Sequence, residues 1–150
     1  MSELKTRLRS DLTTSMKARD TMTLGTIRMV LTAIGNEEVA GKSARELTDA
    51  EVVTVLTREA KKRREAAEAF AAAGRDELAE KERAEGEIIG RYLPEQLSET
   101  EIADIVTAAI AETGAEGPRA MGVVMKVVQP KIAGRAEGGK VAAEVKRQLG

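Results

Sequence analysis

The chain has 150 residues and neither cysteine nor histidine, which excludes disulfide bonds, thiol chemistry, metal sites built on Cys or His, and histidine as a general base. Apolar residues make up 42% of the chain but aromatics only 1%, so we expect a core of Leu, Ile, Val, Met and Ala, which is typical of packed helices. The net charge is −1, yet residues 118–150 hold seven Lys/Arg and two Glu, an asymmetry that can indicate a surface for polyanions.

Apolar residues four apart predict two amphipathic helices at the start of the chain. The first carries Leu4, Leu8, Leu12 and Met16, and the second, capped by Asp20 or Thr21, carries Leu24, Ile27, Leu31 and Ile34. We expect Gly35 and Gly41 to loosen the chain and residues 37–47 to form a polar connection.

A capping box formed by Thr48 and Glu51 predicts a long helix that ends near Ala73, before Gly74. The next helix is expected over residues 75–92. Gly86 should weaken this helix by about 0.5–1 kcal/mol relative to alanine. The apolar positions of the two helices are Val52, Leu56, Ala60, Ala67 and Phe70, then Leu78, Ile88, Ile89 and Tyr92, and we expect Tyr92 to pack between two domains.

The best domain boundary lies at Pro94, because the residue before a proline is disfavoured in a helix. A second capping box, Ser98 with Glu101, restarts helical structure soon afterwards. Three shorter helices are expected beyond it, on the stripes Ile102, Ile105, Val106 and Ala109, then Met121, Val124, Met125 and Val128, then Val141, Val145 and Leu149. The sequence therefore predicts an all-α protein with an N-terminal helical domain, 1–94, that contains a long helical hairpin, and a small three-helix C-terminal domain, 95–150.

No basic segment followed by an apolar one opens the chain, and its apolar runs fall far short of the roughly 20 residues of a membrane helix. We therefore expect a soluble, cytoplasmic protein that does not enter membranes.

The densest basic run is Lys61-Lys62-Arg63-Arg64, which could bind phosphate. On a helix, however, four consecutive residues point in different directions. Lys61 and Arg64 also precede Glu65 and Glu68 by four residues, so we favour neutralisation of this run by acidic neighbours.

Residues 134–140 begin like a phosphate loop, but Val141 stands where a nucleotide-binding loop needs Ser or Thr, and a helix is expected before them. We therefore reject an ATP site. A glycine-rich turn that opens a helix still presents free amides to an anion. Lys126, Lys131, Arg135 and Lys140 are thus the candidate nucleic-acid-binding residues, with an ordinary turn bearing solvated lysines as the equal alternative.

Several longer motifs resemble those of the GatB/YqeY family, in order along nearly the whole chain. They are Ile27-Arg28-Met29 and Glu37, Lys61-Lys62-Arg63-Arg64-Glu65, Phe70, Ala73-Gly74-Arg75, Leu78, Lys81-Glu82, the run from Tyr92 to Ser98, Met121 to Met125, Pro130-Lys131 and Gly134 to Gly138. Two positions depart from the pattern: Gly86 replaces a larger apolar residue, and Val123 replaces a common lysine.

The resemblance implies an all-α fold shared with the tail of the B subunit of the tRNA-dependent amidotransferase, a tail implicated in holding tRNA. Three functions follow as hypotheses. The first is an accessory module that binds tRNA or another structured RNA, without cofactor, metal or catalysis of its own. The second is amidotransferase-type activity, a carbon–nitrogen ligase with glutamine as amido donor, or assistance to amidotransferase subunits. The third is a helical adaptor between proteins.

Overall fold

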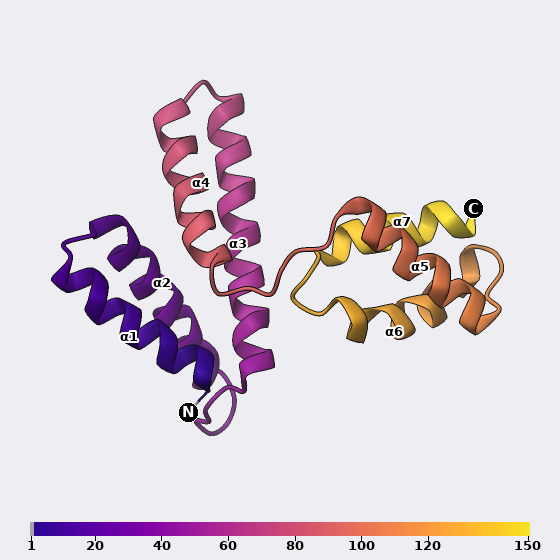
Figure 1. Cartoon of the computed structure of the whole chain (residues 1–150), viewed down its shortest axis with the longest axis horizontal. Helices are drawn as coiled ribbons and strands as arrows, with labels where there is room; N and C mark the ends of the chain where they lie inside the picture. The colour runs from indigo at the N-terminus through magenta and orange to yellow at the C-terminus, as the bar shows by residue number, and fades with distance from the viewer. Residues whose placement is uncertain (1) are drawn as a thin grey trace. The chain divides into compact units, whose positions relative to one another are not determined.

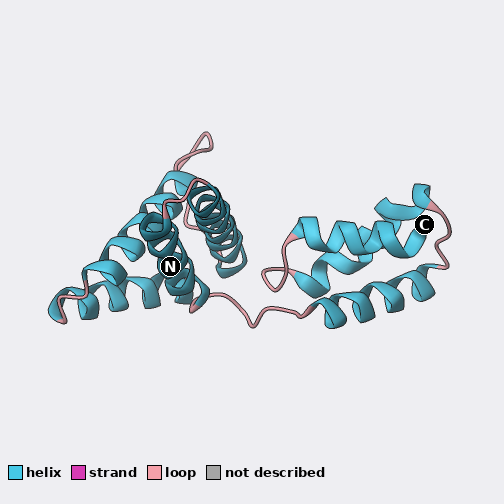
Figure 2. Ribbon diagram, turned by 90° about the horizontal axis from the view of Figure 1, so that it is seen from above, coloured by secondary structure: helices cyan, strands magenta, loops and turns pink. Residues whose placement is uncertain are grey.

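The structure is a computed structural model that describes residues 2–150. Within this range it contains seven α-helices, one short 3-10 turn and no strand, which confirms the all-α prediction (Figures 1 and 2). The chain divides into two compact units, an N-terminal unit of residues 1–93 and a C-terminal unit of residues 94–150. No helix of the described chain combines the length and apolar character needed to cross a membrane.

The N-terminal unit begins with the helical hairpin of α1 (Glu3–Lys17) and α2 (Thr21–Glu38) (Figure 1). Arg19, at φ 57°, turns the chain between them, and the Asp20 carboxylate caps α2 by accepting a hydrogen bond from the Thr23 amide at 3.1 Å. Helix α2 continues through Gly35 to Glu38, so the predicted loosening at Gly35 is wrong. A helical glycine costs about 1 kcal/mol, and the burial of the neighbouring Ile34 offsets that cost.

A second hairpin joins α3 (Asp49–Ala72) to α4 (Asp76–Gly90), as predicted from the sequence (Figure 1). The capping box of Thr48 and Glu51 is present at its start, and Gly74 turns the chain at φ 74°. The two helices pack along their lengths and approach closely at Gly86, where an added Cβ would lie 3.7 Å from the Cβ of Arg63.

The core of the N-terminal unit is aliphatic, as its composition predicts. Its buried members are Leu8, Ile27, Val30, Ile34, Leu47, Val52, Val55, Leu56, Ile89 and Tyr92. Two predicted core residues, Met16 and Leu78, are instead 51% and 39% exposed. A spacing of four residues advances about 40° per step around a helix, so the stripe from Leu4 has left the core by Met16, and Ser15 is buried instead.

Tyr92 packs inside the N-terminal unit, whereas the sequence analysis expected it at a contact between two domains. Its ring is buried in the core of the N-terminal unit. Its hydroxyl donates a hydrogen bond to the Asp11 carboxylate on α1, and the Arg7 guanidinium lies 4.6 Å from the ring centroid. The chain therefore ends this unit by anchoring Tyr92 to α1 before it reaches Pro94.

The C-terminal unit consists of α5 (Glu99–Thr113), a 3-10 turn (Pro118–Ala120), α6 (Met121–Ile132) and α7 (Gly138–Leu149) (Figures 1 and 2). The predicted capping box of Ser98 and Glu101 opens α5. The buried core residues are Ile102, Val106, Ala109, Val124, Val128, Ile132, Val141 and Val145, and all but Ile132 lie on the three predicted stripes. The Gln148 side-chain amide joins α7 to α5 by donating a hydrogen bond to the Ala103 carbonyl at 3.0 Å.

Candidate nucleic-acid interface

The turn between α6 and α7 is fixed against the segment that leads into α5. Gly134 takes φ 72°, and the Arg135 amide donates to the Ile132 carbonyl at 2.8 Å. The Leu97 amide donates to the Arg135 carbonyl at 2.7 Å, and the Gln96 side chain donates to the Gly134 carbonyl at 2.9 Å. These bonds give the predicted glycine-rich turn a defined position, with Arg135 beside the start of α5.

Helix α7 begins without a side-chain cap. Side-chain oxygens of Ser2, Asp20, Thr48 and Ser98 cap α1, α2, α3 and α5, whereas the N-cap residues of α4, α6 and α7 make no side-chain capping bond. The first amides of a helix have no intrahelical acceptor and carry part of the positive end of the helix dipole. A Cβ added at Gly138 or Gly139 would meet nothing within 4 Å, so the backbone there is open to an approaching anion.

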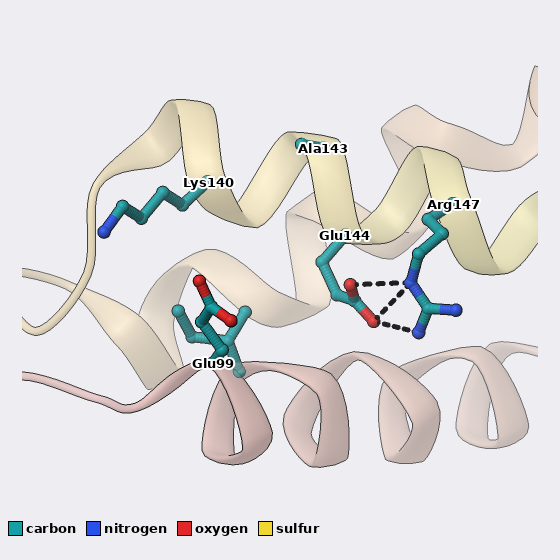
Figure 3. Close-up of a pocket in the computed structure, with 6 residues that line it drawn as sticks. Glu99, Lys140, Ala143, Glu144 and Arg147 are labelled. Atoms are coloured by element: carbon teal, nitrogen blue, oxygen red, sulfur yellow. Dashed lines mark hydrogen bonds and ion pairs between the residues drawn. The ribbon is translucent and has the colours of Figure 1, made fainter.

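Lys140 belongs to a groove of about 440 Å³ between α5 and α7 (Figure 3). The lining residues are Glu99, Ile102, Lys140, Ala143, Glu144 and Arg147. Glu144 accepts hydrogen bonds from the Arg147 Nε at 3.0 Å and from the Gln148 side chain at 3.0 Å. These bonds lower the pKa of Glu144 to about 2, so the carboxylate holds Arg147 as an ion pair along one side of the groove (Figure 3).

Arg147 was missed by the sequence analysis. It lies seven residues after Lys140, and residues seven apart share one face of a helix. That spacing places Arg147 on the face of Lys140, although it lies beyond the glycine-rich motif.

The four predicted residues do not form one cluster. Arg135 donates from Nε to the Glu95 carbonyl at 3.4 Å, and Lys140 shares its groove with Glu99, so both lie near the start of α5. Lys131 pairs with Glu112, with Nζ 3.5 Å from Oε2. Lys126 is exposed on α6, and because it lies five residues before Lys131 the two point about 140° apart.

The positive charge of residues 118–150 is balanced within the folded unit. Residues 94–117 contribute six acidic residues and no basic one, so the C-terminal unit as a whole holds seven Lys/Arg and eight Asp/Glu. A polyanion would therefore be attracted by the local arrangement at the start of α7 rather than by the net charge of the unit.

The basic run on α3 is neutralised by acidic side chains, as the sequence predicts. Lys61 lies 3.9 Å from Glu65 and Arg64 lies 3.9 Å from Glu68, the two pairs expected from four-residue spacing. Lys62 pairs with the buried Glu59 at 3.2 Å. The fourth, Arg63, turns toward α4 and lies 3.5 Å from Glu82 and 3.9 Å from Glu85, so it binds the hairpin together.

The part of the chain that the structure describes contains no candidate metal-binding site. No group of three or more Asp or Glu side chains among residues 2–150 is arranged to hold a metal ion.

Comparison with known proteins matches the model of the YqeY-like protein family to residues 5–149, which confirms the family resemblance. The chain is 34% identical over 133 residues to "Altered inheritance of mitochondria protein 41, mitochondrial" of Pyrenophora tritici-repentis, covering 87% of this chain and 71% of that protein. It is 34% identical to the protein of the same name from Clavispora lusitaniae, over 87% of this chain and 76% of the relative. An uncharacterized protein of Schizosaccharomyces pombe is 38% identical over 63% of this chain and 76% of its own length.

The names of these relatives contradict the prediction of a cytoplasmic protein, because the two proteins from Pyrenophora and Clavispora are both described as mitochondrial. That prediction rested on the lack of a recognisable signal and of a membrane segment. Such absences do not specify a compartment.

Proposed function

Since the chain belongs to the YqeY-like family, we propose that its C-terminal unit binds structured RNA, in the first instance tRNA, as an accessory module without catalysis of its own. The observation that carries the proposal is the start of α7, where Gly138 and Gly139 leave the backbone open between Arg135 and Lys140. Amides at a helix start together with flanking cations are a recurring way to bind phosphate.

The phosphate contacts proposed are those of Lys126, Lys131, Arg135 and Lys140. Lys140 and Lys126 are exposed, whereas Lys131 would have to leave Glu112 to reach a phosphate. Three to four contacts on duplex RNA correspond to a slope of about −3 for the logarithm of the association constant against the logarithm of salt concentration. Binding of this kind is salt-sensitive and recognises the shape of the RNA backbone more than its sequence.

The test is fluorescence anisotropy of labelled bulk tRNA, titrated with the whole chain at two salt concentrations. A triple variant with Lys131, Arg135 and Lys140 changed to Glu should lose binding. Its control changes the exposed Lys17, Lys42 and Arg75 of the N-terminal unit to Glu, which alters net charge by the same amount. Retention of binding in the control and loss in the first variant supports the proposal.

Two results would overturn it. Equal loss in both triple variants would mean that net charge alone attracts the RNA. No binding by the unmodified protein at low salt would remove RNA as the ligand of this surface and direct the search to protein partners.

A further inference from the structure

A second polar groove lies in the N-terminal unit. It has a volume of about 240 Å³, below the 300–1,000 Å³ of pockets that hold drug-sized ligands, so its size suits a small metabolite. One face of α1, the start of α2 and the residues after α4 border this open groove. The lining residues are Arg7, Asp11, Thr14, Ser15, Ala18, Asp20, Thr23, Arg91 and Tyr92.

Most of the polar groups in this groove already have partners. Tyr92 donates to Asp11, and the Arg7 guanidinium lies against the Tyr92 ring and donates to the Arg91 carbonyl at 3.3 Å. Asp20 accepts from the amide and the hydroxyl of Thr23, at 3.1 and 2.7 Å. These bonds fix the walls of the groove before any ligand enters.

Arg91 differs from its neighbours. Its guanidinium, on an exposed residue, forms no hydrogen bond or ion pair within residues 2–150 and so keeps a set of five donors for an anion. The fixed fork of a guanidinium matches a carboxylate in a bidentate arrangement. Asp20 and Arg91 line the same small groove, and the Thr23 hydrogen bonds keep the pKa of Asp20 below its ordinary value, so the two opposite charges face one small volume.

Asp20 and Asp11 make a purely anionic ligand unsuitable. Their carboxylates line the same small volume as Arg91, and they would repel a phosphate or a dicarboxylate. A ligand with one carboxylate and one ammonium group satisfies both signs of charge, since a carboxylate oxygen has more acceptor positions than the two Thr23 bonds fill.

We propose that this groove binds a small α-amino acid, with its carboxylate on Arg91 and its ammonium group on Asp20. Because the groove is small and lined by Ala18, Thr14 and Thr23 as well, we expect the amino acid to have a short side chain. The proposal is independent of RNA binding, because every residue that carries it belongs to the N-terminal unit.

The experiment records amide proton–nitrogen NMR spectra of the whole chain with a pool of the twenty common L-amino acids at millimolar concentration. The expected result is a joint shift of the amides of Asp20, Thr23, Arg91 and Tyr92. A mixture of methylamine and acetate at the same concentration carries the same charges on separate molecules and should leave these amides in place. Separating the pool then identifies the amino acid.

Two variants test the assigned contacts. Arg91→Gln should weaken binding at least tenfold, while Arg119→Gln, an exposed arginine of the C-terminal unit, should leave it unchanged. Asp20→Asn keeps a capping side chain on α2 but removes the charge, so the fold is retained and binding should again fall. The proposal is overturned if the pool shifts none of these amides, if Arg91→Gln binds as well as the unmodified protein, or if acetate alone gives the same shifts.

Discussion

The Tyr92 hydroxyl donates a hydrogen bond to the Asp11 carboxylate over 2.5 Å, joining the end of the α4 segment to the middle of α1 across 81 residues of sequence. Tyr92 is otherwise buried among aliphatic side chains, and Asp11 is half-buried. This bond fixes the last residues of the N-terminal unit and forms one wall of its polar groove.

Replacing Tyr92 with Phe should lower the free energy of unfolding of the N-terminal unit by about 1.5–3 kcal/mol. A hydrogen bond to a charged group contributes that much, and its loss leaves a half-buried carboxylate without its donor. Urea unfolding at neutral pH measures the change. The double variant that also carries Asp11→Asn should lose less stability than the sum of the two single losses, because both changes remove the same bond. Simple additivity would show that the bond contributes nothing in solution.

The same pair predicts a dependence of stability on alkaline pH. Burial, and then the hydrogen bond to Asp11, raise the pKa of Tyr92 above its ordinary value of 10.0. A group whose pKa is raised by folding adds stability that is complete below its unfolded pKa and is lost as pH rises toward the folded pKa. The stability difference between the unmodified protein and Tyr92→Phe should therefore be constant from pH 7 to about pH 9 and shrink above about pH 10. A difference that grows with pH would contradict the assignment.

The lowered pKa of Glu51 predicts a loss of stability in acid. The Arg45 guanidinium, followed by the Thr48 amide, lowers the pKa of Glu51 to about 2, and the carboxylate completes the capping box of α3. A lowered pKa gives stability that is present above the unfolded value of about 4.5 and lost as pH falls toward 2. Glu51→Gln should therefore lower the melting temperature at pH 6 but not at pH 2. A deficit that stays the same across this range would exclude ionisation as its cause.

Two glycines of the α3–α4 hairpin should respond oppositely to alanine. At Gly86 the new Cβ would meet the Arg63 Cβ at 3.7 Å, an ordinary contact, so the gain in helix propensity should stabilise the protein by about 0.5–1 kcal/mol. At Gly74, where φ is 74°, alanine should cost about 1 kcal/mol or more because a side chain disfavours this conformation. Thermal unfolding of both variants tests the pair. Destabilisation by Gly86→Ala would mean that the added Cβ lies closer to Arg63 than 3.7 Å and that α3 and α4 must separate to admit it.

Local signals predicted most of the fold. Both capping boxes, the stop at Gly74 and the three short stripes after Pro94 correspond to observed helix ends and core residues, because each depends on neighbours within a few residues. The partner of Tyr92 was not predictable in this way. It lies on α1, and only the packing of α4 against the first hairpin brings the two together.

The candidate sites were predicted less completely for the same reason. The glycine-rich turn and Lys140 follow from sequence, but the neutralisation of Lys131 by Glu112 depends on a helix 19 residues away. The polar groove of the N-terminal unit gave no sequence signal, since Asp20 and Arg91 are joined only by the fold.

The Glu144 carboxylate should weaken the proposed binding of RNA to the C-terminal unit. It neutralises Arg147 and places a negative charge in the groove that contains Lys140 (Figure 3). Glu144→Gln should free Arg147 for a further phosphate contact and tighten tRNA binding several-fold. It should also steepen the salt dependence by up to about 0.9 on duplex RNA. Anisotropy titrations at several salt concentrations measure both quantities.

The matched control is Glu116→Gln, which makes the same change in net charge at an exposed position of the C-terminal unit outside the groove. If Glu116→Gln tightens binding as much as Glu144→Gln, the gain is a general effect of charge and Arg147 makes no contact. A steeper salt slope in Glu144→Gln alone would instead place the RNA backbone along α7, because only an added phosphate contact changes the number of ions released.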